Sequence, residues 1–163
     1  MTKEITAEQI WEMLEDVKDP EVPVLTVVDL GVVRHVEKKE NHWLITITPT
    51  YSGCPAMQVI ENDIIKRLNQ EGLSCKVKTV LSPAWTTDWL STSGKKKLKE
   101  YGIAPPQDEV DKSVLFGEPT IVPCPLCDSK NTKMVSQFGS TACKAHYKCL
   151  DCLEPFDYFK CLR

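Results

Sequence analysis

Apolar residues recur at helical spacing close to the N-terminus. Residues 6–9, Thr-Ala-Glu-Gln, have the form of a capping box. The apolar side chains that follow on one helical face are Ile10, Met13, Leu14 and Val17. Pro20 comes soon after them, and the residue before a proline is pushed out of helical geometry. The pattern therefore predicts a helix over residues 6–18 that ends near Asp19.

Alternation of apolar and polar residues predicts strands further along the chain. Residues 25–36 are rich in valine and are interrupted at Gly31, which indicates an extended segment with a turn or bulge there. A polar hairpin turn is expected over residues 37–41. Residues 43–48 then alternate with period two, which is typical of a strand packed on one face. The same period over residues 75–81 predicts a third strand.

Two further helices complete the first part of the chain. The apolar residues at helical spacing after Pro55 are Met57, Ile60, Ile64 and Leu68. Residues 86–88, Thr-Thr-Asp, offer an N-cap for a last helix that is broken or bent near Gly94. The predicted order is helix, strand, strand, helix, strand, helix. The expected fold class is α+β, with a small sheet, at least one hairpin and helices packed on the sheet.

Cysteine divides the chain of 163 residues into two parts. Six of the eight cysteines lie between Cys124 and Cys161. The preceding stretch contains three prolines, several acids and little hydrophobic periodicity, which indicates a linker. We therefore predict an α+β domain over residues 1–100, a linker over 101–119 and a small cysteine-rich domain over 120–163.

The spacing of four cysteines predicts a metal site. They form two Cys-x-x-Cys pairs separated by 21 residues, and they are Cys124, Cys127, Cys149 and Cys152. Two such turns can bring four thiolates to the corners of a tetrahedron, and so short a segment buries too little apolar surface to fold comfortably alone. A structural zinc ion, with an apparent binding energy of about 10–16 kcal/mol, would stabilise a zinc ribbon. Iron in the same ligand set is the alternative.

Cys54 and Cys143 are the candidates for thiol chemistry. Pro55 fits the first helical position, so Cys54 should lie at or beside the N-cap, where backbone N–H groups and the helix dipole favour a thiolate. A small buried residue under a tight turn is the alternative. Cys143 lies in a loop of small residues beside Lys144, where an unligated loop cysteine is the alternative. Cys75 is expected to be a core residue at a strand edge.

Three acidic residues follow the first predicted helix. Asp19, Glu21 and Asp29 could supply acid–base groups or metal ligands, and a turn cap with a solvated loop explains them equally well. The sequence shows no Ser-His-Asp triad, dinucleotide fingerprint or phosphate loop beside them.

Charge and hydropathy exclude several partners. The net charge is -3, and residues 120–163 carry six basic and four acidic side chains, an excess that four thiolates with a divalent metal would cancel. A nucleic-acid binder needs a basic stripe. No run approaches the ~20 apolar residues of a membrane span, and the N-terminal segment is polar rather than an apolar signal core. We expect a cytoplasmic protein with reduced cysteines and without nucleic-acid or membrane partners.

Three short motifs in the first part resemble a known family. They are residues 19–23 (Asp-Pro-Glu-Val-Pro), 28–33 (Val-Asp-Leu-Gly-Val-Val) and 53–55 (Gly-Cys-Pro). Together they resemble the DUF59 family of iron–sulfur assembly proteins, over about residues 5–100. The resemblance implies that Cys54 is a transient cluster ligand or a sulfur-handling thiol, and that Asp19, Glu21 and Asp29 shape the same pocket.

A second set of motifs is similar to the PaaD family, over nearly the whole chain. They are residues 82–89 (Ser-Pro-Ala-Trp-Thr-Thr-Asp-Trp), 102–106 (Gly-Ile-Ala-Pro-Pro), 138–145 (Phe-Gly-Ser-Thr-Ala-Cys-Lys-Ala) and 154–161 (Glu-Pro-Phe-Asp-Tyr-Phe-Lys-Cys). The family comprises accessory proteins of the phenylacetyl-CoA epoxidase of aerobic phenylacetate degradation, whose oxygenase holds a di-iron centre and whose reductase holds a 2Fe–2S cluster.

The resemblance implies an accessory protein that is not itself an enzyme. On this interpretation the chain assembles or delivers an iron–sulfur cluster, with the reductase as the first candidate for its client, and the zinc ribbon recognises the client. The chief alternative is a zinc-stabilised adapter that supports the oxygenase complex without handling a cluster. A thiol oxidoreductase that uses a Cys-x-x-Cys pair is a second alternative. A cluster shared across a homodimer through Cys54 or Cys143 is also left open.

Overall fold

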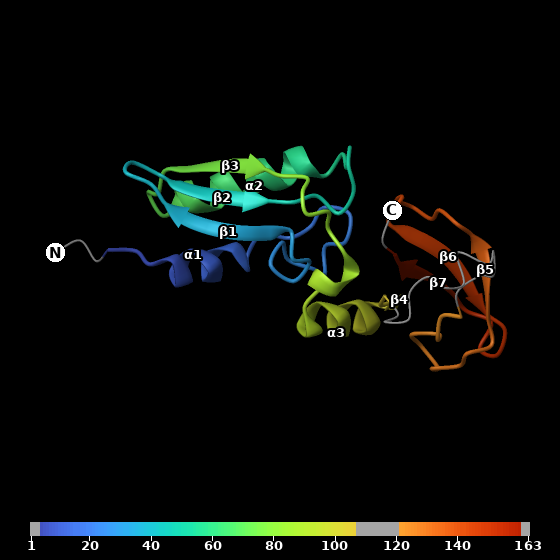
Figure 1. Cartoon of the computed structure of the whole chain (residues 1–163). Helices are drawn as coiled ribbons and strands as arrows, with labels where there is room; N and C mark the ends of the chain where they lie inside the picture. The colour runs from blue at the N-terminus through green and yellow to red at the C-terminus, as the bar shows by residue number, and fades with distance from the viewer. Residues whose placement is uncertain (1–3, 107–120, 161–163) are drawn as a thin grey trace. The chain divides into compact units, whose positions relative to one another are not determined.

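The computed structural model describes residues 4–106 and 121–160, and the chain divides into two compact units. The first unit spans Met1–Gly94 and the second spans Lys95–Arg163 (Figure 1). The sequence places the domain boundaries at residues 100 and 119. The observed division falls earlier because a short strand just after residue 100 joins the sheet of the second unit. The remainder of the predicted linker, residues 107–119, lies outside the described residues.

The first helix, α1 (Ala7–Leu14), begins at the predicted capping box. The Gln9 N–H donates to the Thr6 hydroxyl, and the Gln9 side chain accepts from the Thr6 N–H. The helix ends at Leu14 rather than near residue 18, because the chain turns into extended pairing: the Val17 carbonyl accepts from Val27, and Lys18 bridges to Thr26.

A three-stranded sheet forms the centre of the first unit. Its strands are β1 (Val33–Lys38), β2 (Trp43–Ile47) and β3 (Cys75–Thr79), in the order β1-β2-β3. β1 and β2 form the predicted antiparallel hairpin, whereas β3 runs parallel to β2. The parallel pairing requires a crossover, which the helix α2 (Met57–Gln70) provides.

Residues 25–32 do not form the extended segment that their valines predict. They fold as successive turns between α1 and β1, and the left-handed φ of Gly31 (71°) ends this loop. Most of the apolar side chains of the loop are buried nevertheless: Leu25, Val27, Leu30 and Val32. The difference arises because a buried loop can show the same apolar alternation as a half-buried strand.

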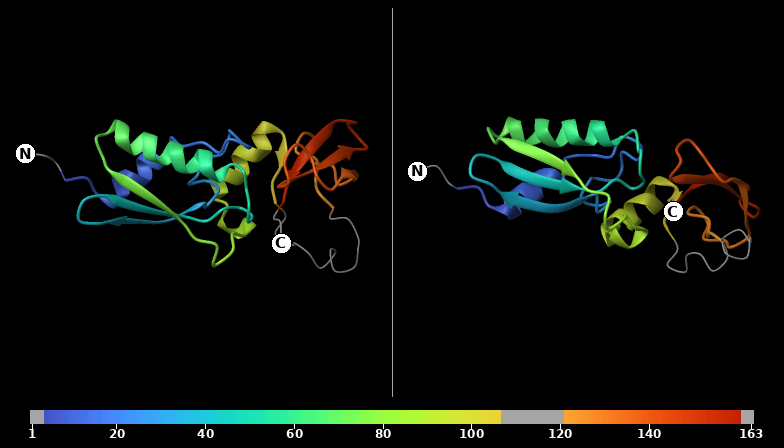
Figure 2. Two further views of the ribbon diagram at one scale, coloured as in Figure 1. Left: turned by 90° about the horizontal axis from the view of Figure 1, so that it is seen from above. Right: turned by 45° about the horizontal axis from the view of Figure 1, so that its top comes forward.

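Helices and sheet bury one aliphatic core. Figure 2 shows α2 lying along the sheet, and α1 packs against α2 and β1. The side chains of the helices and the central strand that have almost no exposed surface are Ile10, Leu14, Ile45, Ile47, Ile60, Ile64 and Leu68. They come from both helices and the central strand, so the α+β arrangement predicted from the sequence is confirmed.

The last predicted helix is split before Gly94. A single 3-10 turn, η1 (Thr87–Trp89), is capped by the Thr86 hydroxyl, which accepts from the Asp88 N–H. The chain then extends, and α3 (Thr92–Tyr101) begins after Ser91, whose hydroxyl accepts from the Gly94 N–H. The break lies earlier than predicted because Ser91 provides a second cap.

The second unit contains a four-stranded sheet. Its strands are β4 (Ile103–Ala104), β5 (Thr132–Ser136), β6 (Lys144–Cys149) and β7 (Pro155–Phe159), in the order β4-β7-β6-β5. An aromatic core covers one face, where Tyr147 stacks on Phe156 at 5.8 Å between ring centroids and meets Tyr158 edge-on at 5.7 Å. None of the helices in the described parts of the chain has the length and apolar character needed to cross a membrane.

Candidate functional site

Four cysteines converge at one end of the second sheet. Cys149 is the last residue of β6, Cys152 lies in the turn before β7, and Cys124 and Cys127 lie in the turn before β5. Their sulfur atoms all lie within 4.8 Å of one another, with Cys124 Sγ 3.8 Å from Cys152 Sγ and Cys127 Sγ 3.6 Å from Cys149 Sγ. The structure thus brings together the four ligands predicted from the spacing.

The sulfur geometry fits a tetrahedral metal ion. A zinc–sulfur bond of about 2.3 Å implies sulfur–sulfur edges of about 3.8 Å in a regular tetrahedron. The two distances above agree with that edge. Cys124 and Cys149 are buried and Cys127 and Cys152 are exposed, so the group lies at the surface with one side inside the protein. These four residues would hold a structural zinc ion and close the ribbon.

Backbone N–H groups act to lower the pKa of two of the four cysteines. The Cys152 N–H donates to Cys149 Sγ at 3.5 Å and, with the Asp151 N–H and the neighbouring thiols, lowers the pKa of Cys149 to about 7. The Ser129 N–H acts to lower the pKa of Cys127, but burial and the neighbouring thiols raise it to about 12. Four adjacent sulfurs do not all ionise without a positive charge between them, which is what a metal supplies.

Polar contacts join the two Cys-x-x-Cys turns, called the two knuckles below. The Leu150 N–H donates to the Asn131 carbonyl at 2.8 Å, and the Asn131 side chain donates to Asp151 at 2.8 Å. The Ser129 hydroxyl also donates to Asp151. These bonds fix one knuckle against the other, and the sequence spacing alone gave no sign of them.

Cys54 lies in the loop between β2 and α2. The sequence places it at or beside the helix N-cap, but the N-cap is Ala56, and no side chain caps this helix. Burial raises the pKa of the half-buried Cys54 thiol; hydrogen bonds from the Ala56 N–H and Tyr51 act in the opposite direction. The thiol is therefore mainly protonated at neutral pH, rather than a thiolate favoured by the helix dipole.

Asp19 and Glu21 are brought close to Cys54. Their negative charges add to the upward shift of the Cys54 pKa. Asp19 is buried, and its carboxylate accepts from the Glu21 N–H at 2.8 Å and the Val22 N–H at 2.7 Å. Asp19 thus caps a turn, as one of the two interpretations of this acidic segment expects, and its charge also acts on the Cys54 thiol.

Asp29 connects two segments of the same unit. Its carboxylate accepts from the Thr26 N–H and from the Ser91 hydroxyl, both at 3.2 Å, and its carbonyl accepts from the Ser91 N–H at 2.8 Å. The side chain is buried, with 4% of its surface exposed. These contacts give Asp29 a structural function in holding the start of α3 against the loop.

Cys143 belongs to the second unit and is buried directly before β6. Its sulfur lies 3.0 Å from the Thr141 hydroxyl, and its carbonyl accepts from the Lys160 N–H at 2.8 Å. Burial lowers the pKa of Lys160, and the interaction with Cys143 acts in the opposite direction. Cys161 lies outside the described residues.

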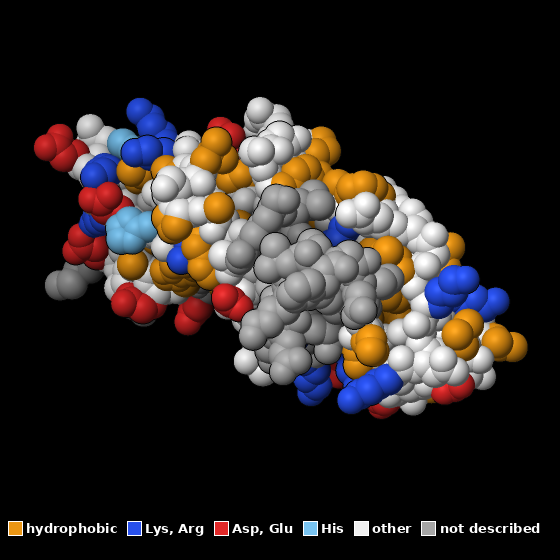
Figure 3. Space-filling view, turned by 45° about the vertical axis from the view of Figure 1, so that its right-hand side comes forward, with side chains coloured by type: hydrophobic (Ala, Val, Ile, Leu, Met, Phe, Trp, Pro, Cys, Tyr) orange, Lys and Arg blue, Asp and Glu red, His pale blue; other side chains and the backbone are white. Residues whose placement is uncertain are grey.

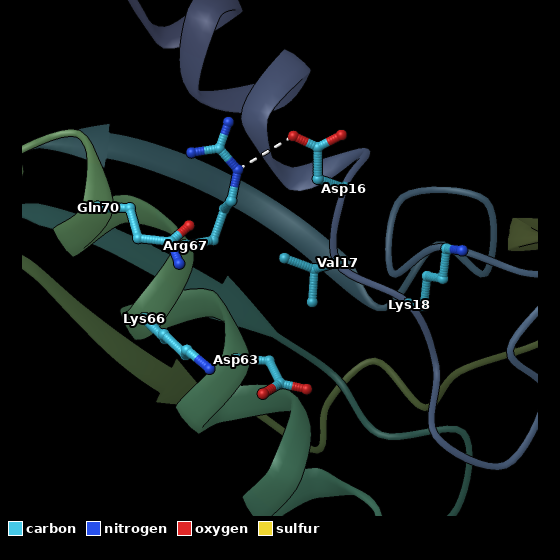
Figure 4. A pocket seen from close by; sticks show the side chains of 7 residues that line it. All are labelled: Asp16, Val17, Lys18, Asp63, Lys66, Arg67 and Gln70. Atoms are coloured by element: carbon cyan, nitrogen blue, oxygen red, sulfur yellow. Dashed lines mark hydrogen bonds and ion pairs between the residues drawn. The ribbon is translucent and has the colours of Figure 1, made fainter.

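A surface pocket of about 310 Å³, which no sequence motif indicates, lies between the segment that follows α1 and the helix α2. Figure 4 shows Arg67 of α2 pointing at Asp16, with Nε 3.0 Å from the carboxylate. A second bond joins Arg67 to Glu71 at 2.9 Å. Arg67 thus forms ion pairs with the turn that follows α1 and with the C-cap of α2. These ion pairs explain the charged residues of the pocket as structural contacts.

Comparisons with known proteins agree with both units. The sequence model of an iron–sulfur cluster assembly protein family matches residues 7–81, and that of the PaaD zinc beta ribbon domain matches residues 108–160. The Fe-S protein maturation auxiliary factor YitW of Bacillus subtilis is 36% identical over 96 residues, 57% of this chain and 93% of the relative. A crystal structure of a DUF59 domain from Bacillus anthracis, 33% identical, superposes with a TM-score of 0.52 over 56% of this chain and 89% of that one.

One relative matches across both units. It is a putative subunit of the 1,2-phenylacetyl-CoA epoxidase of Escherichia coli, which is 47% identical over 155 residues, 94% of this chain and 92% of the relative. A match of this extent includes the iron–sulfur assembly domain, the cysteine ribbon and the segment between them. The chain therefore belongs to the PaaD family.

Proposed function

We propose that this chain is an accessory subunit of phenylacetyl-CoA epoxidase that acts in the cytoplasm and assembles or delivers an iron–sulfur cluster for the reductase component. Identity of 47% to a putative epoxidase subunit along nearly the whole chain supports the association with the epoxidase. The iron–sulfur assembly match over residues 7–81, and the maturation factor related to it, support the handling of a cluster. The epoxidation itself would be catalysed by other subunits.

The observation that carries the proposal is the position of Cys54. Its thiol is half-buried in the iron–sulfur assembly domain, and the charges of Glu21 and Asp19 act on it. Carboxylates near a thiol attract cationic iron, and a protonated thiol stays unreactive until that iron arrives. When Cys54 Sγ bonds to an iron of the cluster, it replaces a ligand by which the donor held that iron, so the bond from iron to that ligand breaks; the Cys54 S–H bond also breaks, and its proton leaves to the displaced ligand, a carboxylate or water. Cluster capture should therefore become faster as the pH rises.

The ribbon has a different part in the proposal. Its four sulfurs are arranged for a resident structural metal, so they are not available to carry a cargo cluster. The second unit would hold the chain on the epoxidase while Cys54 of the first unit handles the cluster.

Replacing Cys54 by serine tests the proposal, and Cys75→Ser is the matched control. Both cysteines lie in the first unit, both are half-buried, and burial raises the pKa of both thiols. The reductase should be purified anaerobically from cells that produce all epoxidase components with each variant. With Cys54→Ser, its iron and acid-labile sulfide should fall to the level found without the chain, whereas Cys75→Ser should leave them unchanged.

The adapter alternative makes the opposite prediction. A zinc-stabilised adapter that never handles a cluster would be indifferent to Cys54→Ser. Full cluster occupancy and full epoxidase activity with that variant would therefore reject cluster handling and favour the adapter.

A further inference from the structure

The two knuckles present leucine side chains to solvent. Leu126 lies inside the first knuckle, Leu150 lies inside the second, and Leu153 directly follows it. Their exposed fractions are 59%, 46% and 64%. Each leucine directly precedes or follows a cysteine of the metal group. Because the four sulfurs lie within 4.8 Å of one another, the three leucines are attached close to the same site. Clustered exposure of this kind is typical of an interaction site.

Comparison of the two knuckles singles out Leu153. The residue after the last cysteine of each knuckle has a left-handed backbone: φ is 60° at Asp128 and 65° at Leu153. Aspartate tolerates this conformation, and Asp128 is further held by an ion pair with Lys99 at 2.7 Å. Leucine is disfavoured there, and glycine would fit without strain. An exposed leucine in a strained backbone conformation does not stabilise the ribbon. We therefore expect Leu153 to act through contacts with a partner molecule.

Two lysines lie on neighbouring strands of the sheet that ends in the knuckles. Lys133 of β5 and Lys148 of β6 are direct cross-strand partners, and both are exposed. Like charges in that position repel each other. Among the described residues neither has an ion-pair partner, and Lys148 points to the opposite face from its neighbour Cys149, which is buried. On the second unit, Figure 3 shows lysine or arginine side chains next to hydrophobic ones.

We propose that these five residues, Leu126, Leu150, Leu153, Lys133 and Lys148, form a docking surface for a protein partner whose contact area has an apolar centre and carboxylates at its edge. Resting on the proposed function, the partner is a component of the epoxidase. The leucines enter the apolar centre, and the acidic edge neutralises the lysine pair. Charge complementarity favours an acidic protein, because Lys133 and Lys148 are direct cross-strand neighbours and neither has an ion-pair partner among the described residues.

Binding of the full-length chain to purified epoxidase components tests this surface. Leu153→Gly removes an apolar contact and the left-handed strain together, so the variant should keep its zinc and be at least as stable to heat, while its affinity falls roughly tenfold or more. Leu81→Ser in the first unit, where Leu81 is 60% exposed, is the control and should bind as the parent does. Lys133→Glu with Lys148→Glu should weaken binding by a similar factor, and more at low salt than at high salt.

Several results would overturn the docking surface. Parental affinity in both Leu153→Gly and the lysine double variant would do so. Tight binding of an RNA oligonucleotide by the parent chain, if the lysine variant loses it, would also overturn the proposal. The same is true if Leu153→Gly abolishes self-association while binding to the epoxidase persists.

Cys54→Ser separates this inference from the proposed function. That variant should bind the epoxidase normally and fail only in cluster loading. If Leu153→Gly binds normally while Cys54→Ser still fails to load, the docking surface is wrong and the proposed function stands. If Cys54→Ser loads normally while Leu153→Gly loses binding, the docking surface stands and cluster handling is wrong.

Discussion

The two units of the chain form their cores in different ways. The first buries a continuous group of isoleucine, leucine and valine side chains from helices, sheet and loop. The second has a small aromatic core, and two of the buried members of that core, Cys124 and Cys149, are also ligands in the sulfur group. Side-chain burial is sufficient to specify the first unit, whereas the second is expected to need a cation at the edge of its core. Within the described residues, Cys54 and Cys75 of the first unit thus have no part in holding that unit's core together through a metal.

Removal of the metal should produce the largest difference between the two units. All four tryptophans lie in the first unit, whereas Tyr147 and Tyr158 lie in the core of the second. A strong chelator should unfold the second unit, which loses about 10–16 kcal/mol of metal binding energy. Its tyrosine near-ultraviolet circular dichroism should disappear while tryptophan fluorescence stays unchanged. A parallel change in both signals would contradict the independence of the two cores.

A cavity in the first core should have the converse effect. Ile45 is fully buried in the central strand, so Ile45→Ala should lower the free energy of unfolding of the first unit by about 2–5 kcal/mol. Denaturant titration followed by tryptophan fluorescence measures the loss, and zinc content should not change. The control is Val59→Ala on α2, where the side chain is 45% exposed and the expected loss is about 0.5 kcal/mol or less. Loss of zinc with Ile45→Ala would show that the second unit depends on the first.

Two glycines of the first unit allow the free-energy cost of a steric clash to be separated from that of the backbone conformation. Gly31 and Gly53 have similar left-handed φ angles, 71° and 76°. A Cβ at Gly31 would lie 2.4 Å from the Trp89 carbonyl oxygen, whereas a Cβ at Gly53 meets nothing within 4 Å. Gly53→Ala should cost about 1 kcal/mol for its conformation, and Gly31→Ala about 1–3 kcal/mol more for the clash. Equal losses in thermal unfolding would mean that the contact with Trp89 carries no energy.

The elements whose signal is local are those that the sequence predicts best. Residues 43–47 form a strand with the predicted alternation, and Thr6 caps the first helix as expected. The extended segment predicted over residues 25–32 is wrong because most of its valines and leucines are buried in a loop, without strand pairing. Parallel pairing of β3 is likewise a long-range choice that the alternation of β3 does not encode.

The same distinction applies to the candidate sites. The four ribbon cysteines are found from spacing because each pair forms one local turn, and the two turns bring their sulfurs within 4.8 Å of one another, as ligands of one metal ion would be. The state of Cys54 could not be inferred that way. Its thiol responds to burial and to Glu21 and Asp19, more than thirty residues earlier in the chain, and these outweigh the local effect of the following helix.

The parallel arrangement of β2 and β3 has a consequence for the order in which the first unit folds. The β1–β2 hairpin is local and can form early, but the sheet is complete only after α2 and residue 79 have been added. The Trp85 indole N–H then donates to the Leu30 carbonyl at 2.7 Å, and the Ser91 N–H donates to Asp29, across more than fifty residues of chain. During synthesis, the hydrogen bonds to the Leu30 and Asp29 carbonyls can therefore form only after residues 85 and 91 have emerged, later than Cys54 and the acidic residues that act on it.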